Sequence, residues 1–359
     1  MKLLLRIFAL AVLAFILYLC FWPTDLIMDR WEPPTSPDLA AEGPYQENDL
    51  LKNIQRIVVH EYGEGPEDTA VDTLGRVYCG LSNGKILRYT DLAQEPEVWV
   101  ETGGRPLGMG FDSAQNLIVA DAAKGLISIN PAGEIEVLTT GLNDQPFGFV
   151  DDLDIGADGT IYFSDASAYY GIGRYRDILI SHLGDGRLLA YHPSTGETKL
   201  LLDSLHFANG IAVSPDQQFV LINETSAYRI QRYWIAGPRK GQSEILIENL
   251  PGFPDNISCN GRDKFWVAIP NPRNPTLDDV LPNAFIRKIV YRLPRFLQPT
   301  EVRYSMCIAL SPNGEVLETL HNPAGDHAFI TSVKEVDGKL YFGSLTEPAF
   351  GVMDLPEGL

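Results

Sequence analysis

One unit recurs along this chain: two short strands of alternating polarity joined by a polar turn that contains Asp or Gly. It is clearest in "TAVDTLGRVYCGLSNGKILRY" (69–89). Two such strands around a turn of this composition are typical of a β-hairpin. Copies of the unit begin near residues 69, 109, 151, 210, 256 and 330. Six copies, mostly 40 to 60 residues apart, predict a fold built by radial repetition.

Radial repetition of antiparallel strands is typical of a propeller. We therefore predict an all-β fold, a six-bladed β-propeller that forms one domain over residues 51–359. The stretch "IQRIVVHEYG" (54–63) is expected to add a strand to the last blade, because joining the two chain ends leaves no exposed sheet edge. Helical periodicity is clear only at 274–297 and is weaker at 174–186.

The first 22 residues, "MKLLLRIFALAVLAFILYLCFW", form an apolar segment interrupted only by Lys2 and Arg6. Its apolar length is roughly the 20 residues that cross a bilayer. The two basic residues on one side, with Asp25 and Asp29 on the other, favour a cytoplasmic N-terminus. The residues that follow are bulky and offer no small-x-small cleavage site, which favours an uncleaved signal anchor over a cleaved signal peptide. We predict a single-pass membrane protein whose propeller lies on the extracytoplasmic side.

The net charge of the chain indicates which kinds of binding partner it can have. The chain has 47 acidic and 28 basic residues, a formal net charge of -19. This argues against nucleic acid, which needs a basic binding surface; an acidic chain can instead hold divalent cations, although solubility also explains most of the charge. Residues 23–50 are rich in Pro and acidic residues and are interpreted as a stalk. Four cysteines are too few for a disulfide scaffold, and free buried thiols fit them better.

Oxygen-bearing side chains stand at four of the six expected blade entrances. In a propeller the loops before the innermost strands open onto one end of the central channel, so these side chains should converge. They are Glu67 and Asp68, Asp151 and Asp152, Asn209, and Asp255 and Asn256. Crowded carboxylates repel one another unless a cation lies among them, and hard oxygen ligands suit calcium and, less well, magnesium. The alternative is that Asp and Asn serve only as turn formers.

Several stretches together resemble a known family. They are "GRPLGMGFD", "FVDDLDIGADGTIYFSDAS", "LPGFPDNI" and "DGKLYFGSL", in family order, within a resemblance that covers roughly residues 55–357. The sequence resembles the strictosidine synthase-like family, and within it the adipocyte plasma membrane-associated protein family. That resemblance implies a six-bladed propeller, arylesterase-type activity and an N-terminal membrane anchor. It also implies kinship with paraoxonases, gluconolactonases and diisopropylfluorophosphatase, which are calcium hydrolases.

The same resemblance implies a ligand set. The catalytic calcium of those hydrolases would be held here by Glu67, Asn209 and Asp255, with Asn256 beside them. Asp151 takes a place where the family usually has Asn, which keeps an oxygen ligand and adds a negative charge. Asp68 and Asp152 match the carboxylates that hold a deeper, structural calcium in paraoxonases, which leaves a second ion open.

The sequence also departs from its relatives. Thr331 stands where strictosidine synthase carries a catalytic Glu, which argues against amine–aldehyde condensation. Leu107 stands where paraoxonases carry a His, which puts a His-based general base in doubt. His206 and His327 lie near loops expected to face the channel, where they are either structural or catalytic.

These observations predict a calcium-dependent hydrolase of small esters or lactones. Calcium would polarise the carbonyl group, and Asp255 would be a ligand and also the general base or the nucleophile. Four aromatic residues would line the substrate pocket or fill the core: Phe147, Phe207, Phe253 and Phe350. A non-catalytic calcium propeller that binds a ligand or a protein is the alternative, and a carbon–nitrogen synthase is a third reading.

Overall fold

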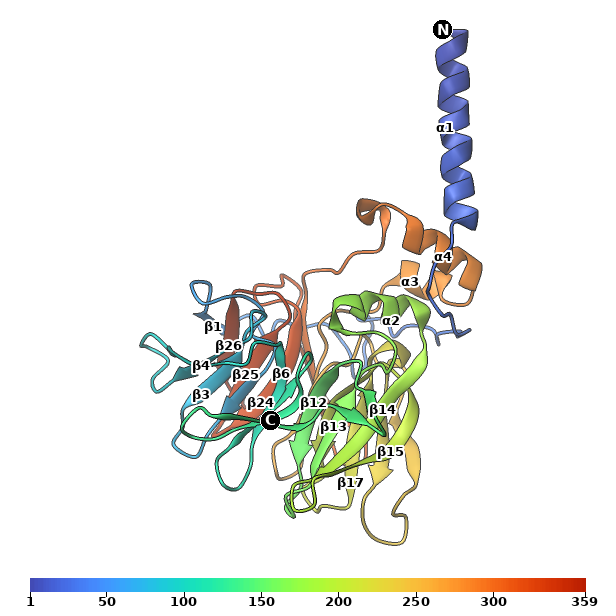
Figure 1. Ribbon diagram of the computed structural model, residues 1–359. Helices are drawn as coiled ribbons and strands as arrows, with labels where there is room; N and C mark the ends of the chain where they lie inside the picture. Colours follow the sequence, from blue (N-terminus) through green and yellow to red (C-terminus); the bar gives the residue numbers. More distant parts are fainter.

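Six four-stranded antiparallel sheets make up most of the structure, a computed structural model that describes residues 1–359 (Figure 1). The strands of each blade are given from the innermost outward. The first blade consists of β2 (Thr69–Val71), β3 (Val77–Gly80), β4 (Lys85–Tyr89) and β5 (Glu97–Glu101), and the second of β6 (Pro106–Phe111), β7 (Leu117–Asp121), β8 (Gly125–Ile129) and β9 (Ile135–Thr139). The third consists of β12 (Val150–Ile155), β13 (Ile161–Asp165), β14 (Gly184–His192) and β15 (Glu197–His206). A small hairpin, β10 (Gly141–Leu142) and β11 (Gln145–Pro146), precedes the third blade.

The other three blades follow the same inner-to-outer order. The fourth blade consists of β16 (Ala208–Val213), β17 (Phe219–Glu224), β18 (Arg229–Trp234) and β19 (Ser243–Ile247), and the fifth of β20 (Ile257–Cys259), β21 (Phe265–Ala268), β22 (Ser305–Leu310) and β23 (Val316–Asn322). The sixth consists of β24 (Ile330–Val336), β25 (Lys339–Ser344), β26 (Ala349–Asp354) and β1 (Gln55–Val58). Neighbouring inner strands contact one another in chain order, and β24 returns to β2. The inner strands therefore form a closed ring, which confirms the predicted six-bladed propeller.

The two ends of the domain meet in the sixth blade. Strand β1 pairs antiparallel with β26, and Gln55 lies opposite Val352. This confirms that a strand from the 54–63 region completes the last blade. The arrangement pairs the edge of β26 with the start of the domain, so the ring needs no other closure.

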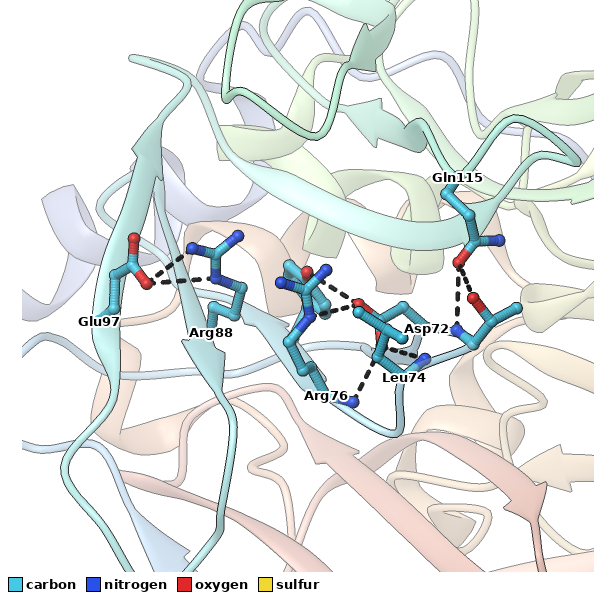
Figure 2. Close-up of polar contacts among 8 residues, drawn as sticks. Asp72, Leu74, Arg76, Arg88, Glu97 and Gln115 are labelled. Carbon is cyan, nitrogen blue, oxygen red and sulfur yellow. Dashed lines mark hydrogen bonds and ion pairs between the residues drawn. The ribbon is translucent and has the colours of Figure 1, made fainter.

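The repeated polar turn is held by its own Asp, as the first blade shows (Figure 2). Asp72 Oδ1 accepts hydrogen bonds from the backbone N–H groups of Leu74 (3.0 Å) and Arg76 (2.9 Å), and its Oδ2 accepts from Arg76 Nε (2.6 Å). Gly75 completes the turn with a left-handed φ of 76°, a conformation that costs glycine little. Gln115, from the next blade, accepts hydrogen bonds from the N–H and hydroxyl of Thr73. The turn is thus a structural device, and it also joins adjacent blades.

The two predicted helical insertions lie on one side of the propeller (Figure 1). Within 274–297 the structure has α3 (Pro275–Val280), α4 (Ala284–Arg292) and a short 3-10 helix, η3 (Arg295–Leu297). Helix α3 ends at Val280, just before Pro282, a residue that disfavours helix in the position preceding it. Asn283 then caps α4, its side chain accepting hydrogen bonds from the N–H groups of Phe285 and Ile286. The weaker segment holds η1 (Ile172–Arg174) and α2 (Tyr175–Ser181), and from Gly184 the chain is already in β14. A further 3-10 turn, η2 (Thr225–Ala227), joins β17 to β18.

Helix α1 (Lys2–Phe21) stands away from the propeller on the side that carries α2, α3 and α4 (Figure 1). It is strongly apolar, 20 residues long and has no buried residue, so it meets the length and composition of a membrane span. Residues 23–50 run along the propeller: Asp29 N–H donates to Ser181 O (3.0 Å), and Asn48 Nδ2 donates to Thr319 O (2.7 Å). The boundaries 1–22, 23–50 and 51–359, and the role of 23–50 as a stalk, stay predictions.

The core consists of apolar clusters between neighbouring blades. Tyr78 of β3 packs with Met109 and Val119 of the second blade, for example. Cys79 and Cys307 are fully buried within such clusters, and all four cysteines are free thiols. This agrees with the expectation that the chain has no disulfide scaffold.

Candidate metal centre at the blade entrances

The stretch that carries Asp255 and Asn256 is fixed by three blades. Asp255 N–H donates to Ala268 O (2.9 Å) of its own blade, and Asp255 O accepts from Gly210 N–H (3.2 Å) of the fourth blade. Asn256 N–H donates to Thr331 O (3.0 Å) of the sixth. A Cβ at position 210 would lie 2.4 Å from Asp255 O, so only glycine permits this approach. The Asp-Asn pair therefore belongs to the rigid centre of the ring.

Two other entrances present their side chains from β-bulges. In β12, Asp151 and Asp152 together oppose the single residue Ser164, because the register shifts between Val150 and Leu153. In β16, Asn209 and Gly210 occupy the matching shift between Ala208 and Ile211. A bulge re-aims side chains and is common beside functional sites. The prediction that the oxygen-bearing residues lie just before the inner strand is therefore confirmed for the first and fifth blades. In the third and fourth blades Asp151, Asp152 and Asn209 lie inside the inner strand.

Buried oxygens without hydrogen-bond partners distinguish these residues from turn formers. Glu67, Asn209 and Asn256 are all buried, and Glu67 Oε2, Asn209 Oδ1 and Asn256 Oδ1 have no hydrogen-bond partner. The other Glu67 oxygen accepts from Asn256 Nδ2 (3.1 Å), which ties the first entrance to the fifth. By contrast, both Asp72 oxygens are satisfied within their own turn. Unsatisfied buried oxygens are costly, so these atoms fit a bound cation better than a purely structural role.

Burial and mutual repulsion perturb the carboxyl groups of the site. Burial raises the pKa of Asp255 to about 7, and a hydrogen bond from the Asn209 side chain opposes that rise. Burial also raises the pKa of Glu67 and of Asp151 well above the ordinary range, and the charge of Asp255 adds to both shifts. The charge of Asp255 therefore acts on both other carboxyl groups, and a cation among them would relieve that repulsion.

Arg105 is a member of the site that the sequence reasoning missed. Its positive charge lowers the pKa of both Glu67 and Asp151, against the effect of burial. It is held beside them by a hydrogen bond from Nη1 to Gly65 O (2.8 Å). The available signal was its place in "GGRPLG": it is the charged residue at the entrance of the second blade, which has no oxygen ligand.

The donor set fits calcium only as a mixture of carboxylates and amides. The structure has no group of three His, Cys, Asp or Glu side chains close enough to hold a metal ion by themselves. Glu67, Asp151 and Asp255 would therefore need the amide oxygens of Asn209 and Asn256 to complete a coordination shell. Carboxylate and amide oxygens in larger number are what calcium takes, and the absence of sulfur or imidazole argues against zinc.

Asp68 and Asp152 form a deeper layer. Asp68 Oδ2 accepts from Met109 N–H (2.8 Å) and from Lys334 Nζ (2.6 Å). Asp152 Oδ2 accepts from Ile211 N–H (2.8 Å). Lys334 was not foreseen from the sequence, and it supplies a positive charge inside the channel.

Thr331 and Leu107 both have structural roles. The Thr331 hydroxyl donates to Glu67 O (2.7 Å) and so fixes the backbone of the first entrance. Leu107 is buried in an apolar cluster with Phe149, Phe207 and Leu26. Neither Thr331 nor Leu107 therefore offers an acid or base to the site, and Thr331 supports the backbone of Glu67.

Neither candidate histidine bonds to a candidate ligand. His206 stacks on His182, with ring centroids 4.3 Å apart, and its Nδ1 lies 3.1 Å from His182 O. Both ring nitrogens of His327 are buried without partners, and burial with the nearby Arg56 charge lowers its pKa to about 4. His327 is therefore neutral at physiological pH.

The four aromatic residues proposed for a pocket divide by environment. Phe207 belongs to the apolar cluster over the entrances, which also contains Leu26 from the N-terminal segment. Phe253 is half-buried and packs on Tyr228, with centroids 5.0 Å apart. Phe147 packs on Phe163, and Phe350 is fully buried between the sixth and first blades. Phe350 is thus core, whereas Phe207 and Phe253 stay candidates for contact with a ligand.

Comparison with known proteins shows to which family this chain belongs. A family model described as strictosidine synthase matches residues 151–238, and one described as strictosidine synthase-like, N-terminal, matches residues 43–89. A strictosidine synthase-like protein of Arabidopsis thaliana is 36% identical over 323 residues, covering 81% of this chain and 85% of the relative. The chain belongs to the strictosidine synthase-like family. Adipocyte plasma membrane-associated protein of Homo sapiens is 35% identical over 332 residues, covering 85% of this chain and 79% of the relative.

Solved structures with this fold are distant in sequence. A gluconolactonase of Xanthomonas campestris superposes with a TM-score of 0.62 at 14% identity, covering 94% of this chain and 99% of that structure. Regucalcin of Agrobacterium tumefaciens, described as a calcium-binding protein, superposes with a TM-score of 0.58 at 13% identity, covering 84% of this chain and 94% of that structure. At this identity the likeness shows the propeller fold alone.

Proposed function

We propose that this family member is a calcium-dependent hydrolase of small esters or lactones. The observation that carries the proposal is the set of buried, unpartnered oxygens of Glu67, Asn209 and Asn256, gathered at one end of the channel with the carboxylates of Asp151 and Asp255. Gluconolactonase and the calcium-binding regucalcin are built on the same fold, which is compatible with this chemistry.

Some residues of the site would bind calcium, and one would also take part in the chemical step. Glu67, Asp151, Asn209, Asp255 and Asn256 would hold calcium. When bound there, calcium supplies a Lewis acid that polarises a carbonyl oxygen. Asp255 would take a proton from water or act as the nucleophile. The Asn209 side chain lowers the pKa of that carboxyl group, so it lies beside Asp255 and would help to orient it.

The direct test is a substrate panel with controlled calcium. Phenyl acetate, p-nitrophenyl esters and small lactones are offered to the full chain in detergent, with added calcium or with chelator. We expect turnover of at least one class with calcium and its loss in chelator, because the metal is needed to polarise the carbonyl. Activity that is equal in chelator and calcium would contradict the proposal.

A non-catalytic calcium propeller is the second candidate. Two observations favour it: Leu107, where the resemblance to paraoxonases implies a histidine, is a buried apolar side chain, and Leu26 is buried in the same cluster with Phe207. Such a protein would bind calcium and a ligand or protein partner without turnover. It predicts calcium binding with no hydrolysis of any member of the panel, so the same experiment separates the two. A carbon–nitrogen synthase finds no support, since Thr331 donates its hydroxyl to the backbone.

We further propose that α1 stays attached and anchors the chain in a membrane, with the propeller on the extracytoplasmic side. In the structure Arg292 Nη1 of α4 donates to Leu19 O at the end of α1 (2.6 Å), so the helix-bearing side of the propeller would face the bilayer. Mature protein is expected to begin at or near Met1 and to require detergent for extraction. N-terminal sequencing that starts between about residues 23 and 30 would show that the segment is cleaved.

A further inference from the structure

A lysine side chain occupies the inner part of the central channel. Lys334 lies on β24, and it lines a cavity of about 250 Å³ between the inner strands, together with Met109, Asp152 and Asp154. Its Nζ donates to Asp68 Oδ2 (2.6 Å) and to the backbone oxygen of Met109 (2.5 Å). The Asp68 side chain is fully buried and that of Lys334 is 24% exposed, so the ion pair is largely removed from water.

The carboxylates around this ammonium group are held in place by other blades. Asp68 accepts from Met109 N–H, Asp152 from Ile211 N–H, and Asp154 from Val213 N–H (2.7 Å). Each bond joins two neighbouring blades, so the positions of the oxygens do not depend on Lys334. The ring itself presents a preformed group of anionic oxygens to whatever cation lies among them.

Lys334 is bonded to Asp68, and its positive charge acts on Asp152 and Asp154. Burial raises the pKa of Asp152 well above its ordinary value and the charge of Asp68 raises it further, whereas the charge of Lys334 lowers it. Burial likewise raises the pKa of Asp154, and Lys334 opposes that shift. Asp152 and Asp154 line the cavity, and Asp68 repels Asp152 and pairs with Lys334, so without Lys334 these carboxylates would lose the positive charge beside them.

The ammonium group of Lys334 occupies two oxygens that a metal ion in this cavity would use. A carboxylate oxygen and a backbone carbonyl are typical calcium ligands, bound at about 2.3–2.6 Å. Here Asp68 Oδ2 and the Met109 carbonyl are already taken by Nζ at hydrogen-bonding distance, and the other oxygen of this carboxylate, Asp68 Oδ1, is buried without a partner. We propose that Lys334 is a built-in cation that replaces the deeper, structural calcium, so that the chain binds metal only at the outer group of Glu67, Asn209 and Asp255. The residues of the inner layer do not fit a second ion while Lys334 is present.

Counting bound ions tests this inference. Native mass spectrometry of the detergent-solubilised full chain with calcium is expected to show no more than one ion for the parent. Lys334→Met removes the charge but keeps the length and stem of the side chain, and it is expected to bind one calcium more than the parent. Lys339→Met is the matched control, because this lysine lies on the adjacent strand β25 and pairs with the exposed Asp354; its ion count should equal that of the parent.

Stability supplies a second readout. In chelator, Lys334→Met is expected to melt about 5–15 °C below the parent, because removing one partner leaves a buried charge uncompensated. Calcium should raise the melting temperature of this variant more than that of the parent, since a ligand stabilises the form that binds it. The Lys339→Met control should follow the parent in both conditions.

The outcomes separate this inference from the proposed function. Two ions in the parent, or equal counts in the parent and Lys334→Met, would overturn it. A parent with no ion and a variant with one would support the role of Lys334 while removing the outer metal centre. If Lys334→Met does not fold with calcium or with chelator, Asp68→Asn provides the test. Because Asp68 pairs with Lys334 and not with a metal ion, this variant is expected to bind as many calcium ions as the parent. Loss of an ion in Asp68→Asn would refute the proposal.

Discussion

Hydrolysis of the best ester or lactone is expected to fall by about two to four orders of magnitude in Asp255→Asn, the usual contribution of a positioned acid or base. An amide oxygen can still coordinate calcium, but it cannot accept a proton from water. The backbone of residue 255, held by Ala268 and Gly210, is unaffected, so the fold should survive. The measurement is kcat at saturating calcium, with thermal melting as the check on folding.

Two further variants make this prediction specific. Asp112→Asn alters a carboxylate that serves its own turn, accepting from the N–H groups of Ala114 and Asn116, and it should keep parental turnover. Glu67→Ala should weaken calcium binding and lower the melting temperature in calcium, because bound metal stabilises only the folded form. Parental turnover in Asp255→Asn would mean that Asp255 is a turn former and would remove the mechanism.

Deleting residues 51–63 is expected to abolish cooperative unfolding of the whole propeller. The segment contributes β1 to the sixth blade and buries Leu51, Ile57 and Val59. Burying such side chains contributes about 1.5–3 kcal/mol each, so their loss would remove about 4.5–9 kcal/mol from a typical domain stability of about 5–15 kcal/mol. It would also expose the edge of β26, which invites aggregation. Circular dichroism during heating is the measurement.

A pair of neighbouring substitutions controls for the deletion. Ile57 is 7% exposed and Val58 is 64% exposed, although both lie on β1. Ile57→Ser should lower the melting temperature by several degrees, whereas Val58→Ser should change it little. A deletion variant that melts like the parent would show that β1 is dispensable and that the ring closes by other means.

Much of this architecture is written locally in the sequence. Strand alternation encodes which side chains are buried, and Asp and Gly mark the turns, so each blade could be recognised from its own residues. The chain order of the blades then placed Glu67, Asn209 and Asp255 at the same end of one channel. The helical insertion at 274–297 was also visible, whereas its division follows from Pro282 and the cap of α4.

Only the tertiary structure decided how the charges of the channel are balanced. Arg105 and Lys334 sit in blades without candidate ligands, so neither stood out from its own surroundings. Lys334 pairs with Asp68 across a separation of 266 residues. No pattern in the residues around Asp68 indicates that Lys334, and not Arg105, will be its partner. The bulges that turn Asp151 and Asn209 into the channel are likewise set by pairing with β13 and β17. The sequence therefore determined which oxygens gather, because burial and turns are local properties. The closed ring decided which cation each oxygen faces, because charge compensation depends on distances across the axis.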